Sequence, residues 1–377
     1  MLGFIRSILE VLKMKKFLPY AVAGVAGAAV CAGAGVAAGL SASRRRTIAS
    51  IKKLAGYPDG YGLYSMDVRY GYDLDAIIAS GIHDDQSMID AFAKAALPLV
   101  PVKIRAPYYG CTAFTMKEAA HGVRMGRSYD FACDTSAMIV RCAPKSGYRS
   151  VATAALDNLS VNDPQKSLAK KAACLLAPFV CLDGMNEKGV CIAVLTLDSD
   201  PVFQQTGKPM ICTSLAIRLV LDRAATAVEA VELLNSYDMF ASSGRDYHFY
   251  ITDATGDGWI VEYDCDSPGR KMVATKTHVA TNFYIMHKDK VLPNQKNGHY
   301  GHGRERYDKA LEVLGEETGN YGDEAAWRCL RAVAQDPNPA DITSNTQWSI
   351  VYNPATLAAQ IAIRRHWGDV IAYGLGE

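Results

Sequence analysis

The sequence predicts an α+β protein whose antiparallel sheets are covered by helices. Strand-like runs come first, helical runs follow in the middle of the chain, and strand-like runs return at the end. No regular alternation of strand and helix occurs, which argues against a parallel, doubly wound sheet. With 377 residues and 49% hydrophobic content, the chain is long enough to bury a sizeable core.

The stretch 109–131 carries the clearest local pattern. The residues that follow Cys111 alternate with a period of two, and 123–130 reads as a second short strand after a turn-prone segment. A hairpin of this kind places Arg127 and Asp130 beside Cys111, although they lie 16 and 19 residues further along the chain.

Cys111 is the candidate nucleophile. A thiol attacks as thiolate, and a nearby guanidinium favours that form by lowering the thiol pKa from roughly 8.5. His121 falls close to the predicted turn, and no histidine stands near Cys111 in an obvious geometry. If the bond between Gly110 and Cys111 were cut, the new α-amine, with a pKa of about 7.7–8.0, could act as the base. Asp130 could then orient that amine.

Four stretches resemble the choloylglycine hydrolase and penicillin V acylase family, the linear amide C–N hydrolases with an N-terminal nucleophile. In family order they are GCTAF at 110–114, GRSYD at 126–130, DGMNEKGV at 183–190 and ATNFY at 280–284, and RERYDKAL at 304–311 is a weaker match. The resemblance implies a four-layer αββα sandwich over 111–377. It also implies hydrolysis of a linear amide after self-cleavage between Gly110 and Cys111.

The resemblance assigns catalytic roles to five residues of this chain. Cys111 is the nucleophile, Arg127 and Arg306 stabilise negative charge, Asp130 orients the amine, and Asn282 donates a hydrogen bond to the oxyanion. No metal and no organic cofactor are needed.

Two positions depart from a simple match to the family. Thr196 stands at a strand end where relatives tend to carry Asn or Tyr, so a backbone N–H near Thr196 is expected to serve the oxyanion. Arg304 and Arg306 both stand at the start of a predicted helix. Arg306 is preferred as the catalytic arginine because an aromatic residue follows it.

Residues 1–46 are interpreted as a targeting region outside the fold. An apolar stretch at 17–42 lies between basic residues, and its 26 residues exceed the roughly 20 that span a bilayer. We expect an uncleaved signal anchor, with a cleaved export signal and a non-membrane segment as alternatives. The expected location is therefore the membrane, the cell envelope or the extracellular space.

The segment 47–110 is interpreted as a pro-region that covers Cys111 until the chain is cut. A plain N-terminal extension that decorates the core is the alternative. Asp84 and Asp85 are N-cap candidates for a helix that runs to about Leu97.

The remaining elements follow from periodicity. Strands at 137–142 and 148–155 are expected to continue the sheet of the hairpin, and 157–172 is expected to be a loop at the substrate entrance. Helical spacing marks 210–236, with a break near Ala224, and it marks 304–316 with Leu311 in the buried stripe. Further strands are predicted at 179–183, 190–197, 247–252, 259–263, 271–276, 346–352, 358–364 and 369–373, the last three closing a second sheet.

Composition limits the partners. The net charge is +1, and no basic stripe with interleaved aromatic residues occurs. The charge pattern therefore does not indicate nucleic-acid binding. The ten cysteines include no C-x-x-C pair, so zinc spacing is absent, and apart from Cys111 they are interpreted as small buried hydrophobes. The expected partner is a small-molecule amide, and the sequence leaves homo-oligomerisation open.

Three alternative functions remain at this stage. An acyltransferase would use the same acyl-cysteine intermediate and pass the acyl group to an amine. A protease of the Cys-His type would need one of the eight histidines beside the thiol. A membrane-tethered binding protein would keep the scaffold without catalysis, because a fold does not fix a function.

Overall fold

The computed structural model describes residues 40–97, 104, 109–118, 120–316 and 322–375. Within these residues, no helix is both long and apolar enough to cross a membrane. Most of the predicted membrane segment, residues 17–39, lies outside the described part of the chain. Membrane attachment and export therefore stay predictions.

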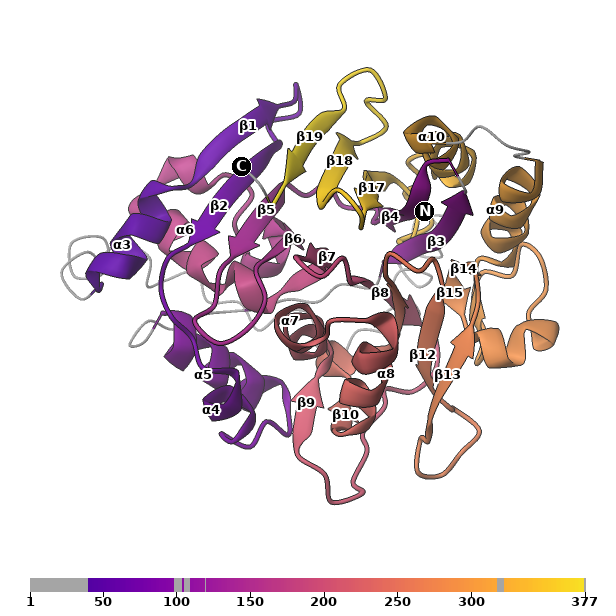
Figure 1. Cartoon of the computed structure of the whole chain (residues 1–377), viewed down its shortest axis with the longest axis horizontal. Helices are drawn as coiled ribbons and strands as arrows, with labels where there is room; N and C mark the ends of the chain where they lie inside the picture. The colour runs from indigo at the N-terminus through magenta and orange to yellow at the C-terminus, as the bar shows by residue number, and fades with distance from the viewer. Residues whose placement is uncertain (1–39, 98–103, 105–108, 119, 317–321, 376–377) are drawn as a thin grey trace, which may run out of the picture. The chain divides into compact units, whose positions relative to one another are not determined.

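Two sheets pack face to face at the centre of the described residues (Figure 1). In the described part of the chain the larger sheet has nine strands in the order β1-β2-β5-β6-β7-β8-β11-β12-β13, and the smaller has six in the order β14-β3-β4-β17-β18-β19. Neighbouring described strands in these two sheets run antiparallel, except that β2 and β5 are parallel. The structure thus confirms the predicted α+β class with antiparallel sheets.

The strand bounds are as follows. The larger sheet contains β1 (Lys52–Gly56), β2 (Gly62–Val68), β5 (Ala137–Cys142), β6 (Ser150–Ala155), β7 (Cys181–Asn186), β8 (Cys191–Leu197), β11 (Asp246–Thr252), β12 (Trp259–Tyr263) and β13 (Met272–Lys276). The smaller sheet contains β14 (Val279–Ala280), β3 (Gly110–Glu118), β4 (Gly122–Asp130), β17 (Thr346–Asn353), β18 (Ala358–Ile363) and β19 (Ile371–Gly374). Two short pairs complete the strands, β9 (Met210–Cys212) with β10 (Asp238–Phe240), and β15 (Asn282–Phe283) with β16 (Gly301–His302).

Helices cover the outer faces of both sheets, which confirms the four-layer αββα arrangement. Helices α9 and α10 pack on β3, β4 and β17, whereas α7 packs on β7 and β8 and α8 on β11. The helices are α3 (Ala42–Ala49), α4 (Leu74–Ile78), α5 (Asp85–Ala96), α6 (Leu168–Ala173), α7 (Thr213–Arg223), α8 (Ala227–Asn235), α9 (Arg304–Glu316) and α10 (Gly322–Val333). Short 3₁₀ helices are η2 (Leu156–Leu159), η3 (Pro164–Lys166), η4 (Cys174–Phe179), η5 (Ser242–Gly244) and η6 (Ile285–Lys290).

Several sequence expectations need correction. Strands β5 and β6 join the nine-stranded sheet and not the sheet of the β3–β4 hairpin, because β5 pairs with the upstream strand β2. The segment 157–172 is folded into short helices instead of an open loop. The first three residues of the predicted helical region 210–236 form strand β9, whereas the expected break near Ala224 is confirmed between α7 and α8. Leu311 is 42% exposed, because α9 buries the face that carries Arg306, Tyr307 and Ala310.

The residues before Cys111 are built into the larger sheet. Strand β2 lies between β1 and β5, so it is an interior strand, and α5 stacks Phe92 on Phe179 with ring centroids 5.2 Å apart. Helix α3 crosses the expected boundary at residue 46, and Arg44 donates hydrogen bonds to the carbonyls that end α5. The expected helix start is confirmed by a capping box between Asp84 and Ser87.

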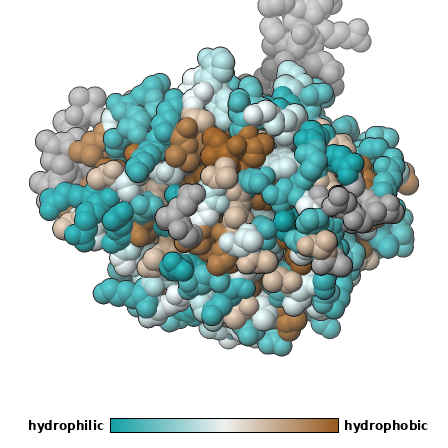
Figure 2. Space-filling view, turned by 45° about the horizontal axis from the view of Figure 1, so that its top comes forward, coloured by the Kyte–Doolittle hydropathy of each residue, from teal (hydrophilic) through white to brown (hydrophobic). Residues whose placement is uncertain are grey.

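Most of the described cysteines are buried, as the sequence predicts. Seven of the nine are buried, Cys133 is exposed and Cys265 is half-buried. The face drawn in Figure 2 is mainly hydrophilic, with hydrophobic residues gathered in limited patches. The apolar residues of the strands therefore lie mostly between the layers.

The β3–β4 hairpin depends on a close approach at Gly126. Phe114 lies directly opposite Gly126 in the ladder, and a Cβ on Gly126 would come within 2.1 Å of the phenyl ring. We expect Gly126→Ala to lower the free energy of unfolding by about 1–3 kcal/mol, because the ring must move in a packed core. Gly71→Ala is the control, since nothing lies within 4 Å of its Cβ position. Equal urea midpoints for the two variants would contradict this packing account.

Candidate active site

Cys111 lies on β3 in the middle of the six-stranded sheet and is fully buried. In the β3–β4 ladder Cys111 is opposite Tyr129, and Gly110 is opposite Asp130. Residues directly opposite each other share a face of the sheet, and successive residues alternate between faces. The hairpin therefore brings Arg127 to the same face as Cys111, toward the other sheet, and Asp130 to the opposite face, toward the helices.

On the inner face, the thiol and Arg127 meet at one carbonyl. Cys111 Sγ lies 3.7 Å from the carbonyl oxygen of Val194, to which Arg127 Nη2 also donates at 3.5 Å. Arg127 Nε is 2.9 Å from Asp183 Oδ2, and both side chains are completely buried. Asp183 also accepts a hydrogen bond of 2.6 Å from Tyr352. This ion pair links β4 of one sheet to β7 of the other.

Burial controls the protonation of the thiol in the uncut chain. Removal from water raises the pKa of Cys111 to about 12, since the positive charges of Arg127 and Arg306 only partly offset burial and the nearby carboxylates. Burial alone would lower the pKa of Arg127, but the surrounding acidic groups outweigh it and raise that pKa above its usual value. Arg127 therefore stays charged and Cys111 is a neutral thiol near neutral pH.

Asn282, on β15 beside the edge of β3, and Arg306, on α9 on the helix side, hold the peptide groups of Cys111. Asn282 Oδ1 accepts hydrogen bonds from the backbone N–H of Cys111 at 2.7 Å and from Arg306 Nη2 at 2.8 Å. Arg306 Nη1 donates to the carbonyl oxygen of Cys111 and to Thr112 Oγ1. Two side chains from distant segments thus fix both polar atoms of the candidate nucleophile's backbone.

Asp130 lies on this same side and is fully buried. Its carboxylate accepts hydrogen bonds from Thr346 Oγ1 at 2.6 Å and Gln335 Nε2 at 3.1 Å, and it lies 3.8 Å from Arg306 Nη1. The carboxylate is therefore held rigidly beside the strand that begins at Gly110.

Thr196 connects Asn282 to the residues before the expected cut. Asn282 Nδ2 donates to the backbone oxygen of Thr196 at 2.9 Å and to its Oγ1 at 3.2 Å. The Thr196 hydroxyl in turn donates to the carbonyl of Tyr109. Arg304, in contrast, lies on the outer side of α9, where it binds Asp308 and the carbonyl of Lys288.

The structure thus brings together six of the predicted site residues, Cys111, Arg127, Asp130, Thr196, Asn282 and Arg306. Their catalytic roles, including the backbone N–H near Thr196, stay predictions. In the described part of the chain, which includes all eight histidines, the thiol of Cys111 contacts no histidine nitrogen within hydrogen-bond distance. The Cys-His alternative therefore lacks its second residue.

Sequence reasoning missed a buried pair behind Asn282. His248 Nε2 lies 2.7 Å from the carbonyl oxygen of Thr281 and must donate to it, while Nδ1 lies 3.1 Å from Glu262 Oε1. Glu262 also accepts from the backbone N–H groups of Ile285 and Met286. The pair therefore holds the chain on both sides of Asn282. Charged residues inside the predicted strands 247–252 and 259–263 were the available signal, and Asp183 gave the same signal at the end of the predicted strand 179–183.

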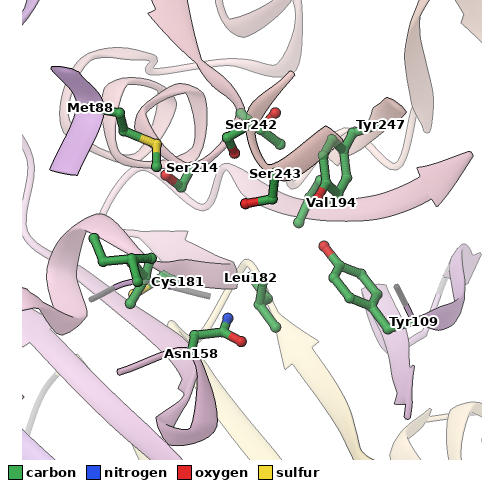
Figure 3. A pocket seen from close by; sticks show the side chains of 13 residues that line it. Met88, Tyr109, Asn158, Cys181, Leu182, Val194, Ser214, Ser242, Ser243 and Tyr247 are labelled. Carbon is green, nitrogen blue, oxygen red and sulfur yellow. The ribbon is translucent and has the colours of Figure 1, made fainter. Parts of the chain in front are cut away.

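A narrow apolar pocket adjoins the thiol side of the site (Figure 3). Its empty space is about 430 Å³, including the part open to solvent. Val194, whose carbonyl touches Cys111, lines it together with Tyr109 and Leu182. Met88 of α5 also lines it, so residues on both sides of the expected cut shape this pocket.

Comparison with known proteins agrees with this geometry. Residues 111–288 match the model of the linear amide C–N hydrolases, choloylglycine hydrolase family. No curated protein matches the sequence. Among solved structures, penicillin V acylase from Agrobacterium tumefaciens is similar with a TM-score of 0.52 and 19% identity, over 71% of this chain and 87% of that one.

Two structures of conjugated bile acid hydrolase from Clostridium perfringens are also similar. One is a cysteine-to-alanine mutant and the other an arginine-to-leucine variant, and both give a TM-score of 0.52 at 15% identity over 71% of this chain. They are covered over 92% and 93% of their own lengths. At these identities the likeness of the structures shows the shared fold.

Together, these findings define the class as hydrolases that act on carbon–nitrogen bonds in linear amides. Within that class, residues 111–288 match the model of the choloylglycine hydrolase family, which agrees with the sequence motifs.

The buried ion pair gives a stability prediction. Asp183→Asn keeps the shape but leaves the charge of Arg127 without its partner, so we expect a loss of about 3–5 kcal/mol in the free energy of unfolding. Asp67→Asn is the control, because that carboxylate pairs with Arg69 at the surface, where such pairs contribute about 0–1 kcal/mol. Denaturant unfolding measures both. A loss below about 1 kcal/mol for Asp183→Asn would show that the pair does not hold the sheets together.

Proposed function

We propose that the chain is a cysteine N-terminal-nucleophile amidase that cuts itself between Gly110 and Cys111 and then hydrolyses a linear amide. One observation supports this proposal above all. Asn282 and Arg306 bind both the N–H and the carbonyl of Cys111 in the uncut chain. An N–H that donates to Asn282 becomes an amine after cleavage and can keep the same partner.

Self-cleavage would start with the thiol of Cys111. Sγ attacks the carbonyl carbon of Gly110, the peptide C–N bond breaks, and the nitrogen leaves as the α-amine of Cys111. Water then hydrolyses the thioester and releases the carboxylate of Gly110. Gly110 suits this position because a Cβ there would lie 2.4 Å from the carbonyl oxygen of Thr343.

The mature site would use the same atoms on an amide substrate. The α-amine takes the thiol proton, Sγ adds to the substrate carbonyl, and Asn282 with a backbone N–H near Thr196 binds the oxyanion. The amine then protonates the leaving nitrogen, and water releases the acyl group as an acid. Among described atoms, Arg127 Nη1 has no hydrogen-bond partner, which leaves a donor for negative charge near Sγ.

The apolar lining of the pocket supports a substrate whose apolar acyl group binds there. The pocket is lined by Val180, Leu182, Val194, Tyr109 and Tyr247, and the carbonyl oxygen of Val194 lies 3.7 Å from Cys111 Sγ. The names of the similar structures, a penicillin V acylase and a conjugated bile acid hydrolase, are consistent with a hydrophobic acyl group on an amide nitrogen.

We further propose that residues 40–110 stay bound after cleavage. Strand β2 pairs with β5 from Leu63–Ala137 to Val68–Cys142, and Tyr70 donates to the carbonyl of Leu175. Release of this segment would expose the hydrogen-bonding edge of β5 and remove Met88, Ile104 and Tyr109, three of the thirteen residues that line the pocket. The active form is thus a two-chain enzyme.

The nucleophile can be tested by substitution. We expect Cys111→Ser to lower kcat/KM on amides with apolar acyl groups by at least about 10²-fold, because a hydroxyl has no comparable anionic form near neutral pH. Cys133→Ser is the control, since Cys133 is exposed. Release of the free amine measures hydrolysis, and added amines that divert the acyl group would reveal an acyltransferase. Unchanged turnover by Cys111→Ser would contradict the assignment of Cys111 as the nucleophile.

The pH dependence of self-cleavage follows from the thiol pKa. Because burial raises that pKa to about 12, the thiolate fraction in the uncut chain rises about tenfold per pH unit throughout the range below it. Cleavage should therefore accelerate as the pH rises. Intact mass recorded against time, on chain synthesised at mildly acidic pH and shifted to higher pH, gives the rate. A rate independent of pH would mean that a group inside the uncut chain already takes the proton.

A further inference from the structure

Metal-ligating side chains gather at a place that the hydrolytic site does not use. Asp264, Cys265 and Asp266 form the turn after β12, and His287 and His299 belong to the segment between β15 and β16. The ligand atoms of Asp264, Cys265 and His287 all lie within 4.8 Å of one another, and so do those of Cys265, Asp266 and His299. Cys265 is common to both groups.

The individual contacts show how closely the two segments converge. His287 Nε2 lies 3.3 Å from Asp264 Oδ1 and 3.6 Å from Asp266 Oδ2, and His299 Nε2 lies 3.5 Å from Asp266 Oδ1. Ligands at 2.0–2.3 Å from a tetrahedral ion are roughly 3.3–3.8 Å from each other. The Asp264–His287 separation of 3.3 Å therefore falls in the range for two ligands of one ion.

The donor set also favours a particular kind of ion. Thiolate, imidazole and carboxylate together are typical zinc ligands, whereas calcium and magnesium prefer oxygen alone. The charges agree, because the two carboxylates carry −2 and Lys290, 3.0 Å from Asp266, offsets one of them. Tyr300 also donates to Asp266, so that carboxylate is already fixed from the outside.

We propose that Asp264, Cys265, His287 and His299 bind one divalent transition-metal ion, best zinc, with Asp266 as the neighbouring carboxylate that adds negative charge beside the ion. Asp264, Cys265 and His287 are only partly exposed, and the more exposed His299 completes the ligand set by a change of side-chain rotamer. On binding, the thiol of Cys265 gives up its proton to water and forms the metal–sulfur bond, while both histidines bind as neutral imidazoles.

The ion would act as a cross-link close to the catalytic residues. It joins the β12–β13 turn to the chain segment that connects β15 with β16, and β15 carries Asn282. Glu262, on the strand before the turn, already binds the start of this segment through Ile285 and Met286. Metal binding would therefore stiffen the support of the oxyanion residue without touching the substrate.

Affinity should rise with pH. A thiol must lose its proton to bind a metal ion, so the metal competes with a proton on the sulfur of Cys265. Each deprotonation that binding requires becomes easier at higher pH, and the apparent affinity increases in that direction.

The test uses the full chain after removal of bound metal, titrated with Co²⁺ and then with Zn²⁺. We expect one Co²⁺ per chain, with a near-ultraviolet thiolate-to-cobalt absorption band that Zn²⁺ abolishes by displacement. Cys265→Ser should remove that band, and His299→Ala should weaken binding by at least about tenfold. Because His299 is half exposed, its replacement tests the site without disturbing the core.

Two controls separate this site from other thiols. Cys133→Ser should keep the band, since Cys133 is an exposed cysteine outside the cluster. Cys111→Ser should also keep it, which distinguishes the site from the catalytic cysteine and its amine. Two results would overturn the proposal and leave the cluster as a set of hydrogen-bonded ion pairs. One is the absence of a thiolate band in the unaltered chain, and the other is a metal affinity of Cys265→Ser and His299→Ala equal to that of the unaltered chain.

Discussion

The candidate site depends on the hydrogen bonds that Asn282 and Arg306 make with the backbone of Cys111. The N–H and the carbonyl of this residue lie inside a sheet, and each is bound by a side chain from a segment more than 170 residues away. In the proposed mechanism, the Asn282 contact places the nitrogen that becomes the amine beside the proposed oxyanion residue before any bond is cut. Arg306 at the same time places a positive charge between Asn282 and Asp130.

The two faces of β3 divide the chemistry. The thiol and Arg127 lie on the inner face, where the second sheet excludes water, and Asp130 lies on the helix face. Asn282 lies at the edge of β3 and reaches Thr196 of β8 in the other sheet. The ion pair between Arg127 and Asp183 crosses between the sheets and fixes the spacing of the inner layer. Burial of this kind is costly unless each charge finds a partner, so the pair and the sandwich depend on each other.

Local pattern was sufficient for much of this arrangement. Alternation around Cys111 predicted the hairpin, the order of strands and helices predicted the α+β class, and the spacing of motifs predicted the six residues that meet. Pairing across long distances could not be inferred, because period-two alternation identifies a strand but not its neighbour. For this reason β5 and β6 were assigned to the wrong sheet.

The same limit explains the residues that were missed. Asp183, His248 and Glu262 stand in strands, and only the packed structure shows that each charge meets a partner. The cluster around Cys265 escaped a search for metal spacing because its ligands come from two segments that are separated by β13, β14 and β15.

The interior position of β2 gives the N-terminal segment a lasting role, because the larger sheet and the pocket wall both include it. The most direct test of the account compares native and denaturing mass spectrometry of the purified protein. We expect denaturing conditions to show two chains, the second beginning at Cys111, and native conditions to show one complex with their summed mass. An uncut chain that is stable at neutral pH, or a free fragment 111–377 that is active without its partner, would contradict the account.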